Sequence, residues 1–299
     1  MESDARVPQL FCFGLGYSAR VIARKLIEQG CRVAATTRDP EKADALRGDG
    51  ITPYLFNDQQ GLSNPAEVMP GVTHLLSSIP PDAQGDPAIH RHGRALTEVF
   101  KGSALRWVGY LSTIGVYGDH QGRWIDEDCP VTPLSRESQR RVLAEEQWLE
   151  FGRSVDAPAH LFRLPGIYGP GGRSQIDALR AGRARRIVKP GQVFNRIHVD
   201  DLADVVIASM KRPGGSSVFN VTDDEPAPAN EVVAYAARLL GMDPPPEVAF
   251  EDADLPPFAV HFYAECKRVR NDRIKEELGV NLRYPTYREG LAATLASTE

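Results

Sequence analysis

Short apolar runs alternate with longer amphipathic segments along the first half of the chain. The first run, Gln9–Phe13, has the length of one buried strand and is too short for a helix. It ends at the turn Gly14-Leu15-Gly16-Tyr17-Ser18-Ala19, after which small and apolar residues recur at helical spacing over residues 17–29. A second apolar run, Arg32–Thr37, follows Gly30. The order strand, glycine turn, helix, strand predicts the first half of a dinucleotide-binding fold.

The same alternation continues downstream. We expect a helix through Lys42 and Leu46, further helices over 89–100 and 135–151, and strands near 53–56, 73–78, 107–112, 160–163 and 218–221. Strands that alternate with helices indicate an α/β fold with a doubly wound, parallel Rossmann sheet. Glycine- and proline-rich turns, a basic helix through Arg180, Arg183, Arg185 and Arg186, and a helix over 202–210 capped by Asp200 and Asp201 follow Leu164. We predict a Rossmann domain over 1–165 plus 198–222, and a smaller C-terminal substrate lobe over 166–197 plus 223–299.

The glycine turn has a specific physical logic. Gly14 permits a bend that a side chain would obstruct, and Gly16 lets a pyrophosphate approach the free N–H groups at the helix start. Ala19 is small enough to keep helix and strand close. We therefore predict that this turn, with Tyr17 and Ser18, binds a dinucleotide; the alternative is a structural turn that binds nothing.

The end of the second strand indicates which dinucleotide. An acidic residue there would accept hydrogen bonds from the ribose of NAD, but the chain has Thr36, Thr37 and Arg38. A guanidinium pairs well with a 2′-phosphate, so we expect NADP in preference to NAD. Asp39-Pro40 is interpreted as the N-cap and first turn of the next helix. Arg38 could instead be a solvated surface residue, and Asp58 either contacts the adenine or belongs to a turn.

Composition excludes several classes of protein. Of 299 residues, 25% are charged and 42% hydrophobic, as in an ordinary globular protein, and the net charge of -5 argues against a nucleic-acid partner. The four cysteines form no C-x-x-C pair, so we expect free thiols and no metal site. No apolar run reaches membrane-spanning length, and the polar N-terminus does not resemble a signal peptide. A cytoplasmic protein with no membrane partner is expected.

Four stretches together resemble the extended and atypical short-chain dehydrogenase/reductases, the NAD-dependent epimerase/dehydratase group. They are the glycine turn and residues 111–118 (Leu-Ser-Thr-Ile-Gly-Val-Tyr-Gly), 163–171 (Arg-Leu-Pro-Gly-Ile-Tyr-Gly-Pro-Gly) and 196–203 (Arg-Ile-His-Val-Asp-Asp-Leu-Ala). The resemblance implies cofactor contacts at Ser77 and Pro165 and contacts to a small-molecule substrate at Tyr117, Tyr168 and His198. It also implies a homodimer formed by two long helices of each subunit.

The family's chemistry uses a Ser or Thr, a Tyr, and a Lys four residues after that Tyr. Thr113 matches the first position, although a threonine at a strand end also bonds to its own backbone. No Tyr lies between Tyr117 and Tyr168, and no Lys between Lys101 and Lys189. Alignment on Ala144-Glu145 instead places Glu137 and Arg141 at these positions, with Ser138 one residue away. Glu137 and Arg141 could equally form a helical ion pair.

Other candidates have simpler explanations. Tyr263 and Lys267 have the required spacing but lie too late in the chain to be the family pair. His198 beside Asp200 and Asp201 is more typical of a structural partner than of a substrate contact. The four arginines of the basic segment are more typical of a solvated face than of a phosphate site. Two functions follow: an NADP-dependent oxidoreductase or epimerase/dehydratase acting on a small hydroxyl, carbonyl or sugar-nucleotide substrate, or a non-catalytic NADP-binding sensor or scaffold.

Overall fold

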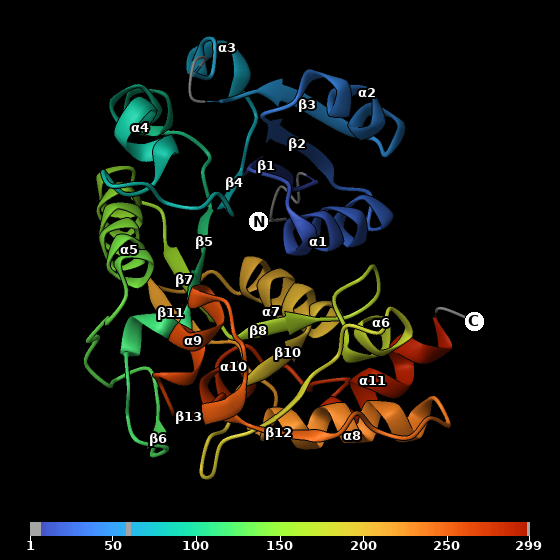
Figure 1. The fold of residues 1–299 in the computed structure, drawn as a ribbon. Helices are drawn as coiled ribbons and strands as arrows, with labels where there is room; N and C mark the ends of the chain where they lie inside the picture. The colour runs from blue at the N-terminus through green and yellow to red at the C-terminus, as the bar shows by residue number, and fades with distance from the viewer. Residues whose placement is uncertain (1–6, 58–60, 298–299) are drawn as a thin grey trace. The chain divides into compact units, whose positions relative to one another are not determined.

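The computed structural model describes residues 7–57 and 61–297, and the chain divides into two compact units (Figure 1). The first unit comprises Met1–Ser112, Arg136–Phe162 and Ala203–Phe219, and the second comprises Thr113–Ser135, Arg163–Leu202 and Asn220–Glu299. These boundaries differ from the predicted domains chiefly because residues 113–135 and 198–202 group with the second unit.

A seven-stranded sheet confirms the predicted α/β Rossmann fold. Its strand order is β11-β7-β5-β4-β1-β2-β3, and β1 pairs in parallel with β2 and β4, as β2 does with β3 and β4 with β5. This is the order of a doubly wound dinucleotide-binding sheet with one further strand. The strands are β1 (Gln9–Phe13), β2 (Arg32–Thr37), β3 (Ile51–Leu55), β4 (His74–Ser77), β5 (Trp107–Thr113), β7 (Ala159–Leu164) and β11 (Ser217–Asn220).

Helices connect these strands at positions close to those predicted. They are α1 (Tyr17–Glu28), α2 (Pro40–Gly48), α3 (Pro65–Val68), α4 (Pro87–Phe100), α5 (Arg136–Ser154) and α7 (Val199–Lys211). Asp39 is the N-cap of α2 and accepts a hydrogen bond from the Glu41 N–H (3.0 Å), as expected. The predicted cap of α7 is wrong, because the helix already begins at Val199 and its first turn contains both Asp200 and Asp201.

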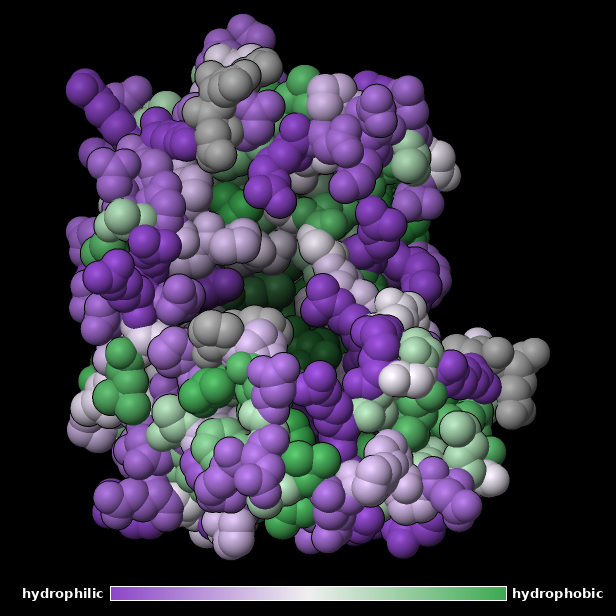
Figure 2. Space-filling model, in the orientation of Figure 1, coloured by the Kyte–Doolittle hydropathy of each residue, from purple (hydrophilic) through white to green (hydrophobic). Residues whose placement is uncertain are grey.

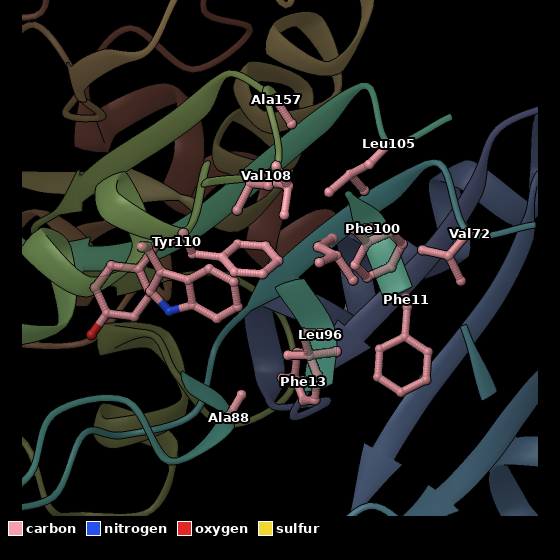
Figure 3. Close-up of a cluster of buried hydrophobic side chains, with 14 of the residues drawn as sticks. Phe11, Phe13, Val72, Ala88, Leu96, Phe100, Leu105, Val108, Tyr110 and Ala157 are labelled. Atoms are coloured by element: carbon pink, nitrogen blue, oxygen red, sulfur yellow. The ribbon is translucent and has the colours of Figure 1, made fainter. Parts of the chain in front are cut away.

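Aromatic and branched side chains fill one face of the sheet in the first unit. Figure 3 shows Phe11 and Phe13 of β1 with Leu96 and Phe100 of α4, and Tyr110 of β5 belongs to the same cluster. Trp148 and Phe151 extend this cluster onto α5. Burial of such large apolar side chains supplies most of the driving force for folding and holds β1, and hence the turn that follows it, in place.

The second unit contains short strand pairs and helices around its own core. The pairs are β8 (Gly166–Tyr168) with β10 (Arg196–His198), β9 (Arg186–Val188) with β12 (Glu247–Ala249), and β6 (Trp124–Ile125) with β13 (Arg268–Val269). The helices are η1 (Ile114–Tyr117), α6 (Gln175–Arg180), α8 (Ala229–Leu239), η2 (Phe250–Asp252), α9 (Pro257–Tyr263), α10 (Asp272–Glu276) and α11 (Tyr287–Ala296). The core cluster includes side chains of β8, α6, α8 and α11.

The expected basic helix is only partly correct. α6 ends at Arg180, and Arg186 lies instead on β9, where it forms an ion pair with Glu247 of β12 at 2.9 Å. This pair joins two strands far apart in the sequence, which the local pattern of charges could not indicate.

The surface in Figure 2 is mostly hydrophilic, with apolar residues in small groups. No helix within residues 7–57 and 61–297 combines the length and apolar character that crossing a membrane requires.

Candidate functional site

The turn between β1 and α1 is anchored by side chains from neighbouring strands. Gly14 has φ +80°, which favours glycine, and its N–H donates to Thr36 Oγ1 of β2 at 2.7 Å. Its carbonyl accepts from Ser78 Oγ and from Cys12 Sγ, both at 2.9 Å. Burial raises the pKa of the Cys12 thiol to about 12, so it remains a protonated donor to this carbonyl. The backbone of the turn is therefore fixed from several directions.

The N-terminus of α1 has the geometry that a dinucleotide pyrophosphate needs. Gly16 is the N-cap residue, is exposed, and provides no side-chain cap, so the first N–H groups of the helix keep their donors available. A Cβ placed on Gly16 would meet no heavy atom within 4 Å, so the space beside it is open. Ala19 is 1% exposed and packs inside the fold as the small residue of the turn. Gly14, Gly16 and Ala19 thus fit a nicotinamide dinucleotide.

Tyr17 and Ser18 occupy the first turn of α1. Ser18 is buried and Tyr17 is half-buried. Both residues directly follow Gly16, the N-cap of this helix.

Among the described residues, Arg38 is an exposed cation directly after β2. Arg38 is exposed, and no hydrogen bond or ion pair joins it to another described residue. Asp39 is occupied as the cap of α2 and lies 3.6 Å from Lys42 Nζ. Asp58, the residue proposed for adenine, lies outside the described residues.

Ser77 is committed to the interior of the first unit. It is fully buried, and its Oγ donates to Asp86 Oδ2 at 2.6 Å. Trp148 Nε1 donates to the same oxygen at 2.8 Å, while the other oxygen caps α4 through the Ala88 N–H. The side chain of Ser77 therefore serves this network, and a contact to a cofactor from Ser77 would have to come from its main chain.

Thr113 caps the short helix η1. Its Oγ1 accepts a hydrogen bond from the Gly115 N–H at 3.1 Å, which is the backbone bond foreseen for a threonine at a strand end. A hydroxyl both donates and accepts, so this bond leaves the hydroxyl hydrogen to donate elsewhere. Thr113 is half-buried, so the hydroxyl is not sealed in the core.

The two residues aligned with the Tyr and Lys positions have different surroundings. Arg141 is half-buried on α5, and its Nη1 donates to the Leu111 carbonyl at 2.7 Å and to the Tyr110 hydroxyl at 3.2 Å, both on β5. Glu137 is exposed, whereas Ser138 beside it is buried. The predicted ion pair between Glu137 and Arg141 is not among the described interactions.

Tyr117 lies inside the second unit. It is fully buried, its hydroxyl donates to Asn220 Oδ1 at 2.8 Å, and the Arg163 guanidinium lies 4.7 Å from its ring centre. Burial raises the pKa of Tyr117 to about 12. These contacts leave no exposed surface of Tyr117 for a substrate.

His198 and Tyr168 lie side by side in the second unit, with ring centres 5.3 Å apart. His198 is buried, its Nδ1 accepts from the Asp200 N–H at 3.2 Å at the start of α7, and the ring of Tyr284 packs at 4.2 Å. This is the structural role weighed for His198. Tyr168 lines a pocket of the second unit, and Pro165 is half-buried between β7 and β8.

The late Tyr and Lys with family-like spacing are also held structurally. Lys267 is buried, and its Nζ contacts the Gly118 carbonyl and Glu265, both at 2.5 Å. Tyr263 packs against Phe194 and Phe250.

The family model that describes the NAD dependent epimerase/dehydratase family matches residues 14–222. The chain belongs to this family. The match begins at Gly14 and includes Thr113, Glu137 and Arg141, so all residues considered for cofactor binding and catalysis lie within the region that defines the family.

Relatives of this epimerase/dehydratase chain include proteins of similar length. A "3-diazoavenalumate denitrifying reductase" of Streptomyces sp is 28% identical over 282 residues, which cover 88% of this chain and 92% of the relative. A solved structure from Silicibacter pomeroyi DSS, described as a functionally unknown conserved protein, is 49% identical with a TM-score of 0.88. It matches 98% of this chain and 100% of its own.

More distant epimerase/dehydratase structures share the fold. MoeE5 in complex with UDP-glucose and NAD is 20% identical, covers 97% of this chain and 98% of its own, and has a TM-score of 0.74. Human epimerase family protein SDR39U1 with NADPH is 14% identical, covers 96% of this chain and 99% of its own, and has a TM-score of 0.73. Relatives of this fold thus include structures with either nicotinamide dinucleotide.

Several residues that shape the cofactor turn were absent from the sequence prediction. Thr36 and Ser78 hold Gly14, and Asp86 joins Ser77 to Trp148. A Thr at the end of one strand and a Ser just after another have no distinctive spacing. The one available signal was that both lie at carboxyl ends of parallel strands, which meet at one edge of the sheet.

Proposed function

We propose that this chain is an NADP-dependent oxidoreductase of the epimerase/dehydratase family, acting on a small carbonyl or hydroxyl substrate. The observation that carries the proposal is the uncapped N-terminus of α1 beside Gly16, which offers N–H donors and open space to a pyrophosphate. When bound, the nicotinamide supplies or accepts a hydride. The relative named as a reductase supports this reaction class, and the UDP-glucose complex of MoeE5 keeps sugar nucleotides among the candidate substrates.

Arg38 supports NADP over NAD. Its guanidinium is exposed at the end of β2, while the nearest acidic residue in sequence, Asp39, is engaged as a helix cap. The two hydroxyls of an NAD ribose would want a carboxylate acceptor at this strand end, whereas a 2′-phosphate would want a cation.

Replacement of Arg38 by alanine tests this preference. We expect Arg38→Ala to weaken NADPH binding about ten- to hundredfold, the equivalent of one lost charge-assisted contact, and to leave NADH binding unchanged. Titration of the purified protein with both dinucleotides, followed by nucleotide fluorescence, measures this. Arg32→Ala, an exposed arginine at the opposite end of β2, is the matched control. Equal binding of NADH and NADPH by the wild type would refute the role of Arg38, and binding of neither would refute the proposal.

Thr113 is the residue we assign to the substrate oxygen. Its hydroxyl accepts from Gly115 and retains a hydrogen that can be donated to a carbonyl oxygen as negative charge develops there. We expect Thr113→Ala to lower kcat about a hundredfold or more with NADPH affinity unchanged, and Thr113→Ser to retain activity. Carbonyl-dependent NADPH oxidation is the assay, and undiminished turnover by Thr113→Ala would remove this residue from the reaction.

A second candidate function is a non-catalytic NADP-binding sensor or scaffold. The observation that favours it is the commitment of Arg141 to the Leu111 carbonyl and the Tyr110 hydroxyl, at the position where a catalytic relative carries lysine. Glu137, in the tyrosine position, is exposed. This function predicts tight NADPH binding with no turnover for carbonyl, hydroxyl or sugar-nucleotide substrates.

A further inference from the structure

A pocket of about 280 Å³ lies within the second unit. Elements β8, β10, α6, α8 and α11 contribute to its wall, and its lining includes Ile167, Tyr168, Arg196, Val232, Tyr287 and Leu291. Every lining residue belongs to the second unit, whereas the glycine turn and Arg38 belong to the first. The pocket therefore concerns a ligand other than the pyrophosphate and ribose of the cofactor.

Arg196 brings a rigidly held positive charge to this pocket. Its Nη1 donates to the carbonyls of Phe194 (2.8 Å) and Ala227 (3.0 Å). A guanidinium carries five N–H donors, and the described residues accept none of the others. The backbone contacts thus fix the plane of the guanidinium and leave further donors for a ligand.

Asp223 attracts Arg196 electrostatically but forms no ion pair with it. Asp223 is buried, its Oδ2 has no hydrogen-bond partner among the described residues, and burial raises the pKa of this carboxyl well above its usual range. No carboxylate of a described residue forms an ion pair with Arg196. Burial also lowers the pKa of Arg196, against the opposing charge of Asp223, so the guanidinium is incompletely hydrated.

Part of the remaining wall is apolar, beside the polar lining residues Arg173, Ser174 and Gln175. Val232 and Leu291 are buried aliphatic side chains of α8 and α11, and Tyr287 adds an aromatic ring. A phosphate ion would leave these surfaces unused, whereas a carboxylate attached to an apolar body would use both the cation and the wall. Planar guanidinium groups pair well with two carboxylate oxygens at once.

We propose that this pocket binds a small monocarboxylate with an aromatic or branched aliphatic body, its carboxylate on Arg196 and its body against Val232, Tyr287 and Leu291. The ligand is bound in addition to the dinucleotide, and its binding does not depend on turnover.

Titration of the full-length protein with benzoate, benzamide and inorganic phosphate, followed by ligand-observed NMR, tests the proposal. Benzoate is expected to bind. Benzamide has the same shape without the charge, and both benzamide and phosphate are expected to bind at least about tenfold more weakly than benzoate. Arg196→Gln is expected to lower benzoate affinity about tenfold or more and to leave NADPH affinity unchanged. Arg180→Gln, an exposed arginine of α6 outside the pocket lining, is the matched control.

A second variant tests the proposal even if Arg196→Gln fails to fold. Gln175 is half-buried and lines the pocket, so Gln175→Trp fills the space and is expected to abolish benzoate binding with Arg196 intact. Equal binding of benzoate and benzamide, or benzoate binding that survives Gln175→Trp, would overturn the proposal. Because NADPH binding is measured on the same samples, failure of this site and failure of the proposed function give different results.

Discussion

At the scale of single residues, the buried polar groups of the first unit are held by specific partners and not by solvent. His74 on β4 is 5% exposed, and its Nδ1 lies 2.8 Å from Thr73 Oγ1. Burial and the charge of Arg106 together lower the pKa of His74 to about 4, although a hydrogen bond with the Met210 backbone opposes the shift. The imidazole is therefore neutral in the folded chain over a pH range in which it becomes protonated when unfolded.

This difference predicts a pH-dependent stability. Since the folded pKa lies below the unfolded value of 6.5, the contribution of His74 is complete above that pH and is lost as the pH falls toward 4. The loss amounts to about 3 kcal/mol in the free energy of unfolding. We expect His74→Gln to flatten this part of the profile, measured by urea unfolding at several pH values. The exposed His261→Gln is the control, and an identical slope for wild type and His74→Gln would contradict the assignment.

Residue-scale roles also show where a sequence motif is ambiguous. Asp39 caps α2 as its position before a proline indicates. Ser77, Tyr117 and His198 lie in family motifs, yet the hydroxyls of Ser77 and Tyr117 and Nδ1 of His198 are hydrogen-bonded within the protein. A motif residue can stabilise the fold or contact a ligand, and the sequence alone does not distinguish these two roles.

At the scale of elements, the packing of β8 against α11 depends on one glycine. A Cβ on Gly290 would lie 1.9 Å from the hydroxyl of Tyr168, and both residues are buried. Tyr168 also packs against His198, so it has little room to move aside. The absence of a side chain at Gly290 therefore allows the core of the second unit to close.

Alanine substitutions in two helices separate this steric role from helix propensity. We expect Gly290→Ala to lower the free energy of unfolding by about 1–3 kcal/mol through overpacking, although alanine favours a helix. Gly48→Ala in α2 is the control, because its Cβ would meet nothing within 4 Å, and a change of at most about 1 kcal/mol in the stabilising direction is expected. Chemical denaturation measures both. Equal stability of Gly290→Ala and wild type would show that Tyr168 adjusts freely.

At the scale of the whole molecule, α4 and α5 carry an apolar groove. The groove has a volume of about 440 Å³ and is lined by residues that include Ile89, Leu143 and Phe151. Leu143 is 37% exposed within it. An exposed apolar face along two long helices of one subunit is the surface from which the family resemblance implies a homodimer.

A charge placed in this groove tests the dimer. We expect the wild type to sediment as a dimer and Leu143→Glu to sediment as a monomer, because an unpaired carboxylate in an apolar interface is costly. Leu134→Glu is the control, since Leu134 is more exposed (61%) and lies outside the groove. A monomeric wild type, or a dimer that persists in Leu143→Glu, would rule out this interface.

The sequence alone determined the Rossmann half of the protein. The elements from β1 to β5, apart from the short helix α3, were predicted because each depends on local properties: an apolar run of strand length, a helical period, a capping Asp39, and glycines at a tight turn. These properties act within a few residues, so they can be inferred from neighbours along the chain. The candidate cofactor residues Gly14, Gly16 and Arg38 follow from the same local order.

Only the tertiary structure decided how the second unit is built and which polar residues remain available. Strands of two or three residues, such as β6, β9 and β10, give no periodic signal and exist because a distant segment pairs with them. The availability of polar side chains also depends on distant segments. Tyr117 donates a hydrogen bond to Asn220, Arg141 donates to the Leu111 carbonyl of β5, and Arg196 has donors that no described residue accepts. Availability depends on contacts between segments far apart in sequence, and those contacts are formed only when the chain folds.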